Sequence, residues 1–414
     1  MTPEIKQRIE QIRRGEVPEG YKKGKLGIVP EEWNETSFST LFTSTSEYTD
    51  DLDKYPLYSL TIEDGVTPKT ERYERSHLVK KEDSYKIVRP NDYAYNPMNL
   101  RFGAVARHKG DMPVAVSGYY DIFTTVHESD LPFMDSFLTC GPMITYYNRV
   151  STGSLVEKQR VHFSQFLEFM LPLPSINERT KIATILTTQD RVIELKEKRL
   201  AEKQRQKKHL RQQLLTGKKR LPGFYGAWSF PKAKELFQSV SDKDHNGDLA
   251  VLSSTQDRGI VPRDEVDIDI KYDACSLVNY KKVSKGNFVI SLRSFQGGIE
   301  YSTYTGLVSP AYTVLSSRKE ISDGYYKQFF KSTDYINRLN VAVYGIRDGK
   351  QISYEDFGRL RIPYPPIKEQ NAIAEALSAA DREIDLLRQD IEQEKQKKKA
   401  LMQLLLTGIA RVKT

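Results

Sequence analysis

The chain has 414 residues, enough for two or three domains that each bury a core, and its 38% hydrophobic and 29% charged content is ordinary for a globular protein. No stretch approaches the roughly 18 consecutive apolar residues of a membrane span and the N-terminus lacks the apolar core of a signal peptide, so we expect a cytoplasmic protein. The net charge of +8 favours a polyanionic partner, and two distant cysteines, Cys140 and Cys275, form neither a metal motif nor a disulfide framework.

The first 30 residues predict a short helix that leads into a globular domain. Ile9, Ile12 and Gly15 form a pattern that returns much later in the chain, at Leu210, Leu214 and Gly217. In both places a hydrophobic residue and a proline follow. We therefore interpret the N-terminus as the tail of a third, truncated copy of a helix that recurs further along the chain.

Two segments, residues 33–165 and 228–356, have the texture of α+β domains. Short apolar or aromatic runs such as Val114–Val116 alternate with turn sequences such as Asp323-Gly324. Each segment opens with a tryptophan, Trp33 or Trp228, eight residues before Leu-Phe. Beyond that point the two sequences diverge, which predicts two related domains with different targets.

Each globular segment is followed by a copy of one long helical segment. Residues 166–217 and 357–408 align without a gap at a shift of 191, and 20 of the 52 positions are identical. Both copies begin with Pro-x-Pro, which allows a helix to start, and end on Leu-Leu-Thr-Gly, whose glycine fits the position that terminates a helix. The first copy predicts a helix of about 40 residues, on the order of 60 Å, from Ile176 to Leu215.

Apolar residues in both copies recur at steps of three and four, the spacing of a coiled-coil seam. A lone helix would expose this stripe, so we expect the two helices to pack on each other. The predicted seam includes Leu200, Leu210, Ile391 and Leu401. Outward apolar positions are better candidates for docking a partner protein: Leu195, Leu386, Leu404 and Leu406.

The motifs of common catalytic sites are absent from the sequence. There is no P-loop, no Gly-x-Gly-x-x-Gly after a strand, no Gly-x-Ser-x-Gly and no histidine spacing typical of a metal site. Asn96-Pro97-Met98-Asn99 is faintly similar to the Asn-Pro-Pro-Tyr motif of adenine methyltransferases, but it lacks the second proline and the stacking aromatic residue. We predict no catalytic, cofactor or metal site in this chain.

The repeated motifs resemble the conserved regions of the specificity subunits of type I restriction–modification systems (the HsdS family). They are Leu-Pro-Leu-Pro-Ser-Ile-Asn-Glu-Arg (171–179), Ile-Pro-Tyr-Pro-Pro-Ile-Lys-Glu-Gln (362–370), the Leu-Leu-Thr-Gly ends and the Trp-led openings. The resemblance covers essentially the whole chain. One minor departure is Asn177-Glu178-Arg179, where the second copy has Lys368-Glu369-Gln370.

The resemblance implies an α+β fold in which two globular α/β target recognition domains are separated by two long α-helices forming an antiparallel coiled coil, with a pseudo-two-fold internal repeat. The expected domains are an N-terminal helix with the first recognition domain (1–170), the first conserved helix (171–217), the second recognition domain (218–361) and the second conserved helix (362–414).

The resemblance also implies a function without catalysis. Each recognition domain would read one half of a bipartite, asymmetric sequence in double-stranded DNA, and the coiled coil would set the spacing. Two modification (methyltransferase) subunits and two restriction (translocase and nuclease) subunits would dock on this scaffold. S-adenosylmethionine, ATP and Mg²⁺ would be bound by those partners, and no membrane would be involved.

Side chains that read base edges are chiefly Arg, Lys, Asn and Gln on loops, because they make bidentate contacts to guanine or adenine. Taken singly, any such residue could instead contact a phosphate or only solvent. The candidates in the first domain are Lys69, Arg72, Tyr73, Arg75, Lys80, Asn96, Asn99, Arg101 and Arg107. Those in the second are Arg258, Lys281, Lys282, Arg293, Ser294, Gln296 and Arg347.

Two alternatives stay open at the level of sequence. A methyltransferase fused to its own recognition domains would need a catalytic domain of roughly 250 residues, and a methylation assay on the isolated chain would detect it. A coiled-coil structural or adaptor protein without DNA specificity would not need two divergent globular domains, and a gel shift with competitor DNA would identify it.

Overall fold

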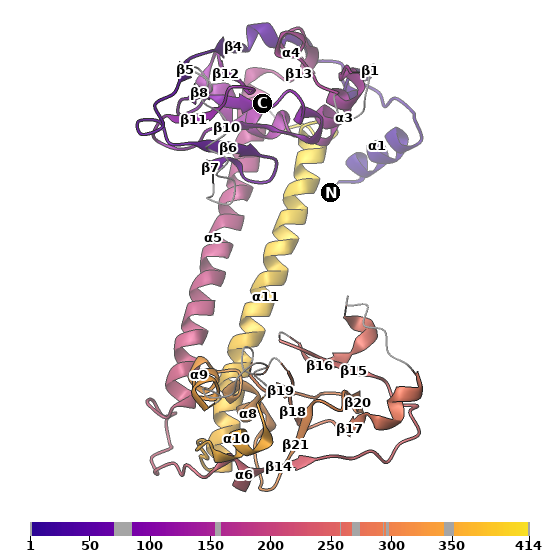
Figure 1. Cartoon of the computed structure of the whole chain (residues 1–414). Coiled ribbons are helices and arrows are strands. Elements are labelled where there is room, and N and C mark those ends of the chain that lie inside the picture. The colour runs from indigo at the N-terminus through magenta and orange to yellow at the C-terminus, as the bar shows by residue number, and fades with distance from the viewer. Residues whose placement is uncertain are drawn as a thin grey trace. The chain divides into compact units, whose positions relative to one another are not determined.

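The computed structural model describes residues 2–69, 85–153, 159–256, 258–266, 274–292, 294, 298–342 and 352–412 (Figure 1). The chain divides into two compact units. Unit 1 comprises Met1–Lys196 and Asp390–Thr414, and unit 2 comprises Glu197–Gln389. Each unit contains one globular domain and parts of two long helices, so unit 1 combines both ends of the chain whereas unit 2 is one continuous stretch.

The two long helices are α5 (Ile176–Leu215, 40 residues) and α11 (Ile367–Leu405, 39 residues), pink and yellow in Figure 1, and they confirm the predicted repeat. Each ends within three residues of a glycine, Gly217 or Gly408. Both glycines have a φ of 71°, the left-handed conformation that commonly terminates helices.

The helices pair antiparallel within each unit. In unit 1 the Lys196 ammonium of α5 lies 2.8 Å from Asp390 of α11, and Asp190, earlier on α5, lies 2.5 Å from Lys398, later on α11. In unit 2 Lys203 lies 2.8 Å from Glu383. Ile391 of the predicted seam is buried, whereas Leu200, Leu210 and Leu401 are half-buried.

Unit 1 confirms the short N-terminal helix and an α+β domain. Its other helices are α1 (Pro3–Arg13), α2 (Leu131–Phe137), α3 (Gly141–Val150) and α4 (Phe163–Leu167). Its strands are β1 (Tyr21–Gly24), β2 (Gly27–Pro30), β3 (Asn34–Ser37), β4 (Phe42–Thr45), β5 (Tyr48–Thr49), β6 (Tyr58–Thr61), β7 (Gly65–Pro68), β8 (Tyr85–Val88), β9 (Tyr93–Tyr95), β10 (Val105–Arg107), β11 (Val114–Ser117), β12 (Asp121–Thr125) and β13 (Met170–Leu173).

Unit 2 has a domain of the same class. Its other helices are α6 (Ala233–Leu236), α8 (Asp323–Phe329), α9 (Thr333–Ala342) and α10 (Tyr354–Arg359). Its strands are β14 (Phe237–Val240), β15 (Leu252–Thr255), β16 (Gly259–Pro262), β17 (Lys281–Val283), β18 (Phe288–Ile290), β19 (Glu300–Tyr301), β20 (Gly306–Val308) and β21 (Thr313–Ser317).

The central sheets of the two domains have the same strand order. The sheet of unit 1 runs β10-β9-β12-β4 and that of unit 2 runs β19-β18-β21-β14, with antiparallel neighbours throughout. The two domains also keep a constant spacing from the opening tryptophan to the start of β10 in unit 1 and of β19 in unit 2. Trp33, Tyr93 and Val105 of the first domain correspond to Trp228, Phe288 and Glu300 of the second, each 195 residues later. The two domains therefore keep the same strand order and residue spacing although their sequences have diverged.

Each domain shares its core with the ends of both long helices. In unit 1 the aromatic residues around Phe38 and Phe123 form one cluster with Ile182 of α5, with Leu405 of α11 and with Leu406, which directly follows α11. The cluster in unit 2 likewise joins aromatic residues of the domain to both helices. Because apolar burial stabilises by about 25 cal/mol per Å², this shared core fixes each domain to its helices.

A buried glutamate at the start of each long helix is held by the tryptophan that opens the domain and by an arginine that follows the end of the other helix. Glu178 of α5 accepts from the Trp33 indole (3.3 Å) and from the Arg411 guanidinium (2.7 and 3.0 Å). Hydrogen bonds to this carboxylate raise the pKa of Arg411 above its usual value.

Unit 2 repeats this three-residue contact. Glu369 of α11 accepts from the Trp228 indole (2.9 Å) and from the Arg220 guanidinium (2.5 and 2.6 Å). We call the two contacts the Trp–Glu–Arg clamps. The Ile-x-Glu motif of the sequence repeat supplies the carboxylate in each clamp, so the motif fixes the domain to the helices.

The residue after each clamp glutamate differs between the units, and so does its partner. In unit 1 Arg179 lies 3.4 Å from the buried carboxylate of Asp130, which directly precedes α2. In unit 2 Gln370 is buried and accepts from the backbone N–H of Ser322 (2.9 Å), which directly precedes α8. The difference between Arg179 and Gln370 in the repeat is therefore accompanied by a difference between Asp130 and Ser322 in the domains.

Candidate nucleic-acid interface

Corresponding hairpins carry loops of the same length in the two domains. The first hairpin loop, residues 96–104, joins β9 to β10, and the second hairpin loop, residues 291–299, joins β18 to β19. Gly103 and Gly298 occupy equivalent positions near their ends, and both have positive φ, 95° and 84°. Predicted base-reading residues fall in both loops: Asn96, Asn99 and Arg101 in the first, and Arg293, Ser294 and Gln296 in the second.

The side chains of the first hairpin loop have different roles. Asn96 accepts from the backbone N–H groups of Met98 and Asn99 (3.1 and 3.4 Å) and so shapes the turn, whereas the Asn99 side chain is exposed. The Arg101 guanidinium donates to Gln159 (3.1 Å) and lies 4.5 Å from the centre of the Phe102 ring. Asn99 is therefore the exposed amide of this loop, and Arg101 is partly engaged inside the protein.

Arg107 belongs to an internal ion pair. Its guanidinium donates to the Asp135 carboxylate at 2.7–3.2 Å, and the Tyr93 hydroxyl and Lys109 ammonium approach the same carboxylate at 2.8 and 3.3 Å. Burial alone would raise the pKa of Asp135, but hydrogen bonds from Arg107 and the charge of Lys109 hold it below its usual value. Reading a base with Arg107 would require breaking this pair.

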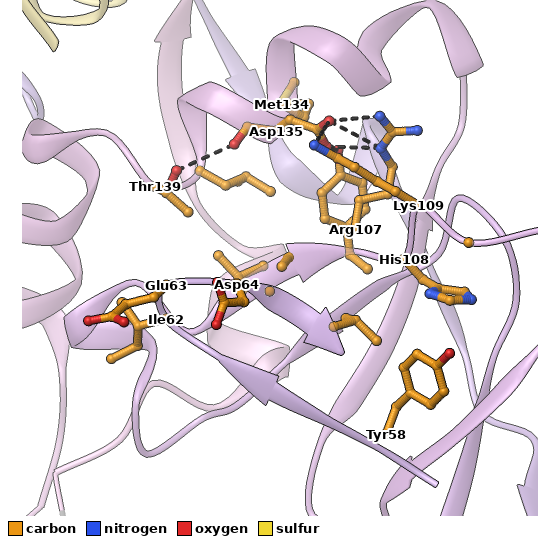
Figure 2. A pocket seen from close by; sticks show the side chains of 17 residues that line it. Tyr58, Ile62, Glu63, Asp64, Arg107, His108, Lys109, Met134, Asp135 and Thr139 are labelled. Atoms are coloured by element: carbon orange, nitrogen blue, oxygen red, sulfur yellow. Dashed lines mark hydrogen bonds and ion pairs between the residues drawn. The ribbon is translucent and has the colours of Figure 1, made fainter. Parts of the chain in front are cut away.

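A cavity of about 350 Å³ lies beside the ion pair, between the β6–β7 hairpin, β10 and α2. Figure 2 shows Arg107 directed at Asp135 on one wall and the turn Ile62–Asp64 on another. The buried imidazole of His108, also in the lining, has its Nε2 2.8 Å from the Met112 carbonyl oxygen. Over the described parts of the chain, no group of three or more His, Cys, Asp or Glu side chains could hold a metal ion.

The described candidates of the second domain are mostly engaged within it. Arg258 pairs with Glu265 through its carbonyl (2.8 Å) and its carboxylate (3.7 Å). Lys281 donates to the Tyr312 carbonyl (2.7 Å), and burial together with nearby Lys243 lowers the pKa of Lys281.

Lys282 lies 3.8 Å from Asp242. Ser294 is buried, which is contrary to an outward base-reading position, because its hydroxyl accepts from the Ser291 N–H (2.8 Å) to hold the loop. Lys69, in the first domain, is exposed. The other predicted positions lie outside the described residues: Arg72, Tyr73, Arg75, Lys80, Arg293, Gln296 and Arg347.

Two of the four predicted docking positions are exposed on the long helices. Leu195 of α5 is 49% exposed and Leu386 of α11 is 65% exposed, and they are equivalent positions 191 residues apart. Leu404 is half-buried. The outward position predicted for Leu406 is wrong: it is buried in the core of unit 1, because the chain beyond α11 folds back over Ile182 and its neighbours.

Two solved structures share this fold. The HsdS subunit from Thermoanaerobacter tengcongensis superposes with a TM-score of 0.50, at 16% identity over 95% of this chain and 98% of that one. A chain from a structure describing complex assembly and conformational transition of the type I R-M system gives 0.57, at 15% identity over 92% of this chain and 99% of that one.

Sequence comparisons indicate the same group of proteins. The family model for the type I restriction modification DNA specificity domain matches residues 230–396. The MjaX type I restriction enzyme specificity subunit of Methanocaldococcus jannaschii is 25% identical over 96% of this chain and 98% of its own length. The MjaVIII specificity subunit of the same organism is 26% identical over 60% of this chain and 64% of its own length. The chain is similar to type I specificity subunits over nearly its whole length.

Specificity subunits are the DNA-recognition components of type I systems and are not catalytic. Within the described ranges, no helix is long and apolar enough to cross a membrane.

Sequence reasoning missed the residues that hold the globular domains of this chain on the helices. The signals were present: Ile-x-Glu recurs in both copies, each domain opens with tryptophan, and Arg179 replaces the glutamine of the second copy. The arginines of the clamps, Arg220 and Arg411, also stand 191 residues apart, three residues beyond the glycine that ends each copy of the repeat.

Proposed function

We propose that this chain is a specificity subunit that recognises a bipartite, asymmetric DNA target, with one half read by each recognition domain. The observation that carries the proposal is the pair of equal-length hairpin loops, at the same place on sheets of the same strand order but with different sequences. Two equivalent loops that carry different side chains suit the reading of two different half-sites. Half-sites read from one face of the duplex should lie about one helical turn apart, ~34 Å centre to centre.

The paired helices are proposed to set the spacing of the half-sites and to dock the partner subunits. Leu195 and Leu386 support the docking role, because exposed leucines at equivalent repeat positions would offer the same contact twice. Two modification subunits would bind there and supply methylation with S-adenosylmethionine. Two restriction subunits, with ATP and Mg²⁺, would complete the assembly.

Selection of binding sites from a random DNA pool, using the full chain, tests the recognition proposal. We expect two short, different motifs separated by a gap of unselected sequence. A single contiguous or palindromic motif would contradict the proposal. Selection should be run at a stated, moderate salt concentration, because contacts to phosphates give sequence-independent binding that weakens steeply with salt.

A second experiment separates the two halves of the target. Asn99→Ala removes the exposed amide of the first hairpin loop, and Leu292→Ala alters an exposed residue of the second. The first variant should lose selectivity only in one half-site, by about 1–3 kcal/mol if Asn99 makes a bidentate base contact, and the second should affect only the other half. Loss of affinity for all sequences alike would identify phosphate contacts instead.

Docking is tested by co-purification with the modification subunit. Leu195→Glu and Leu386→Glu place a charge in each proposed contact, and the double variant should lose the complex. Gln204→Glu with Gln389→Glu, exposed polar positions on the same helices, is the matched control that should retain it. Undiminished assembly of the leucine variant would count against docking at these positions.

A further inference from the structure

The first hairpin loop presents two large apolar side chains beside its exposed amide. Met98 is 47% exposed and Phe102 is 49% exposed, and both belong to the short turn that contains Asn99. Single exposed apolar residues are ordinary on protein surfaces. Here two of them flank a predicted base-reading residue, so the combination indicates a contact surface with both apolar and amide character.

This loop is held in shape without DNA. The Asn96 side chain fixes the turn, the Asn148 amide donates to the Arg101 carbonyl (2.8 Å), and Gly103 closes the loop in a left-handed conformation. The Arg101 guanidinium over the Phe102 ring orients the ring. Side chains that are already ordered lose less conformational freedom on binding, which favours affinity.

The exposed groups match an A·T base pair in the major groove. An asparagine amide can make two hydrogen bonds to adenine N6 and N7, and an apolar side chain can contact the thymine C5 methyl. Insertion of Phe102 between stacked bases is less favourable, because Arg101 covers a face of the ring. The side chains therefore suit contact with the groove edge of the base pair.

Resting on the proposed function, we infer that the first hairpin loop selects a thymine in one half-site through apolar contact of Met98 and Phe102 with its C5 methyl. The second hairpin loop has no such pair at the equivalent positions. At the constant offset of 195, Arg293 and Gly297 stand where the first domain has Met98 and Phe102, and both lie outside the described residues. Sensitivity to the methyl through these side chains should be confined to the half-site of the first domain.

Deoxyuridine substitution tests this inference directly, because it removes the thymine methyl and keeps base pairing. Each thymine of the selected target is replaced in turn, and binding of the full chain is measured at one salt concentration. At one or two positions in the half-site read by the first domain, wild-type affinity should fall about four-fold, the equivalent of one buried methyl group.

Two variants assign that loss to the loop. Met98→Ala and Phe102→Ala should bind the thymine duplex more weakly than wild type, and deoxyuridine should then cost nothing further. Phe102→Leu, which keeps an apolar side chain, should restore part of the four-fold difference. Tyr119→Ala removes another exposed aromatic side chain of the same domain and should retain the full difference.

Two results would overturn the inference. One is equal affinity for thymine and deoxyuridine at every position of the half-site. The other is a four-fold loss that persists unchanged in Met98→Ala and Phe102→Ala. If selection yields no bipartite target, the proposed function fails and takes this inference with it. If the target is bipartite but binding does not depend on the thymine methyl, the inference is wrong and the proposed function stands.

Discussion

The two units hold their recognition domains with one shared contact and one that differs. Both use a Trp–Glu–Arg clamp, in which a buried glutamate binds an indole and a guanidinium. Next to the clamp, unit 1 has the ion pair of Arg179 with Asp130, whereas unit 2 has a neutral hydrogen bond from Ser322 to Gln370. Of the two contacts at each joint between a recognition domain and its long helix, one is therefore the same in both units and the other differs.

The difference indicates which positions change together. A buried arginine without Asp130, or a buried aspartate without Arg179, would leave a charge unpaired, and this is costly in a protein interior. In unit 1 either residue of this pair can therefore vary only together with its partner. We infer that each recognition domain is matched to the long helix that follows it, so the two joints should not accept each other's residues singly.

Breaking a clamp should have the largest effect. Arg220→Ala leaves the fully buried Glu369 carboxylate with only the Trp228 indole, and we expect a loss of about 4 kcal/mol in unfolding free energy. Arg411→Ala should cost less in unit 1, because Arg411 is 33% exposed against 23% for Arg220. Chemical denaturation of the two variants measures both. Equal stability of wild type and Arg220→Ala would show that the clamp is dispensable.

Exchanging the residues that lie beside the clamp should have the next largest effect on stability. Arg179→Gln leaves Asp130 buried without its cation and should cost about 3 kcal/mol. Adding Asp130→Ser gives the residue pair of unit 2 and removes the unpaired buried carboxylate, so it should recover most of that stability.

The reverse exchange is the matched control. Gln370→Arg should destabilise unit 2, and Ser322→Asp should partly rescue it. Additive losses in either double variant would mean that the two positions are independent.

The glycines after the long helices should show a smaller, graded difference. Both have a φ of 71°, where an alanine costs about 1–2 kcal/mol in backbone energy. A Cβ on Gly408 would lie 2.5 Å from Pro30, whereas one on Gly217 would lie 3.1 Å from the Trp228 ring. Gly408→Ala should therefore lower the thermal unfolding midpoint further than Gly217→Ala. The opposite order would contradict this account of the contacts.

The smallest effect concerns acid stability of the paired helices in unit 1. Hydrogen bonds from Lys196 and Gln189 lower the pKa of Glu394 to about 2 from 4.5. A carboxyl with a lowered folded-state pKa contributes stability that is fully present above pH 4.5 and is lost as the pH falls towards 2.

Glu394→Gln should therefore be less stable than wild type at pH 6, and the gap should narrow at pH 3. Urea unfolding at both pH values gives the comparison, with Glu392→Gln, an exposed position on the same helix, as the control. A gap that stays constant with pH would exclude the ionised carboxylate as its cause.

Local signals in the sequence predict much of this fold, and non-local packing accounts for the rest. The bounds of α5 follow from prolines, apolar spacing and a terminal glycine, all within the segment itself. Burial of Leu406 could not be predicted, because it depends on residues such as Ile182 far earlier in the chain. Arg107 was a reasonable candidate by residue type, and only the folded domain brings it to Asp135.

The composition of unit 1 has a consequence for the timing of folding during synthesis. Glu178 precedes its arginine by 233 residues, so at about 5–20 residues per second the ribosome needs roughly 10–50 s to supply the missing half of the clamp. All of unit 2 is translated within that interval. A nascent chain can therefore complete the second recognition domain while the first still waits for the last residues to be made. Chains that end before Arg411 should have a folded second recognition domain and a first recognition domain that lacks its clamp arginine.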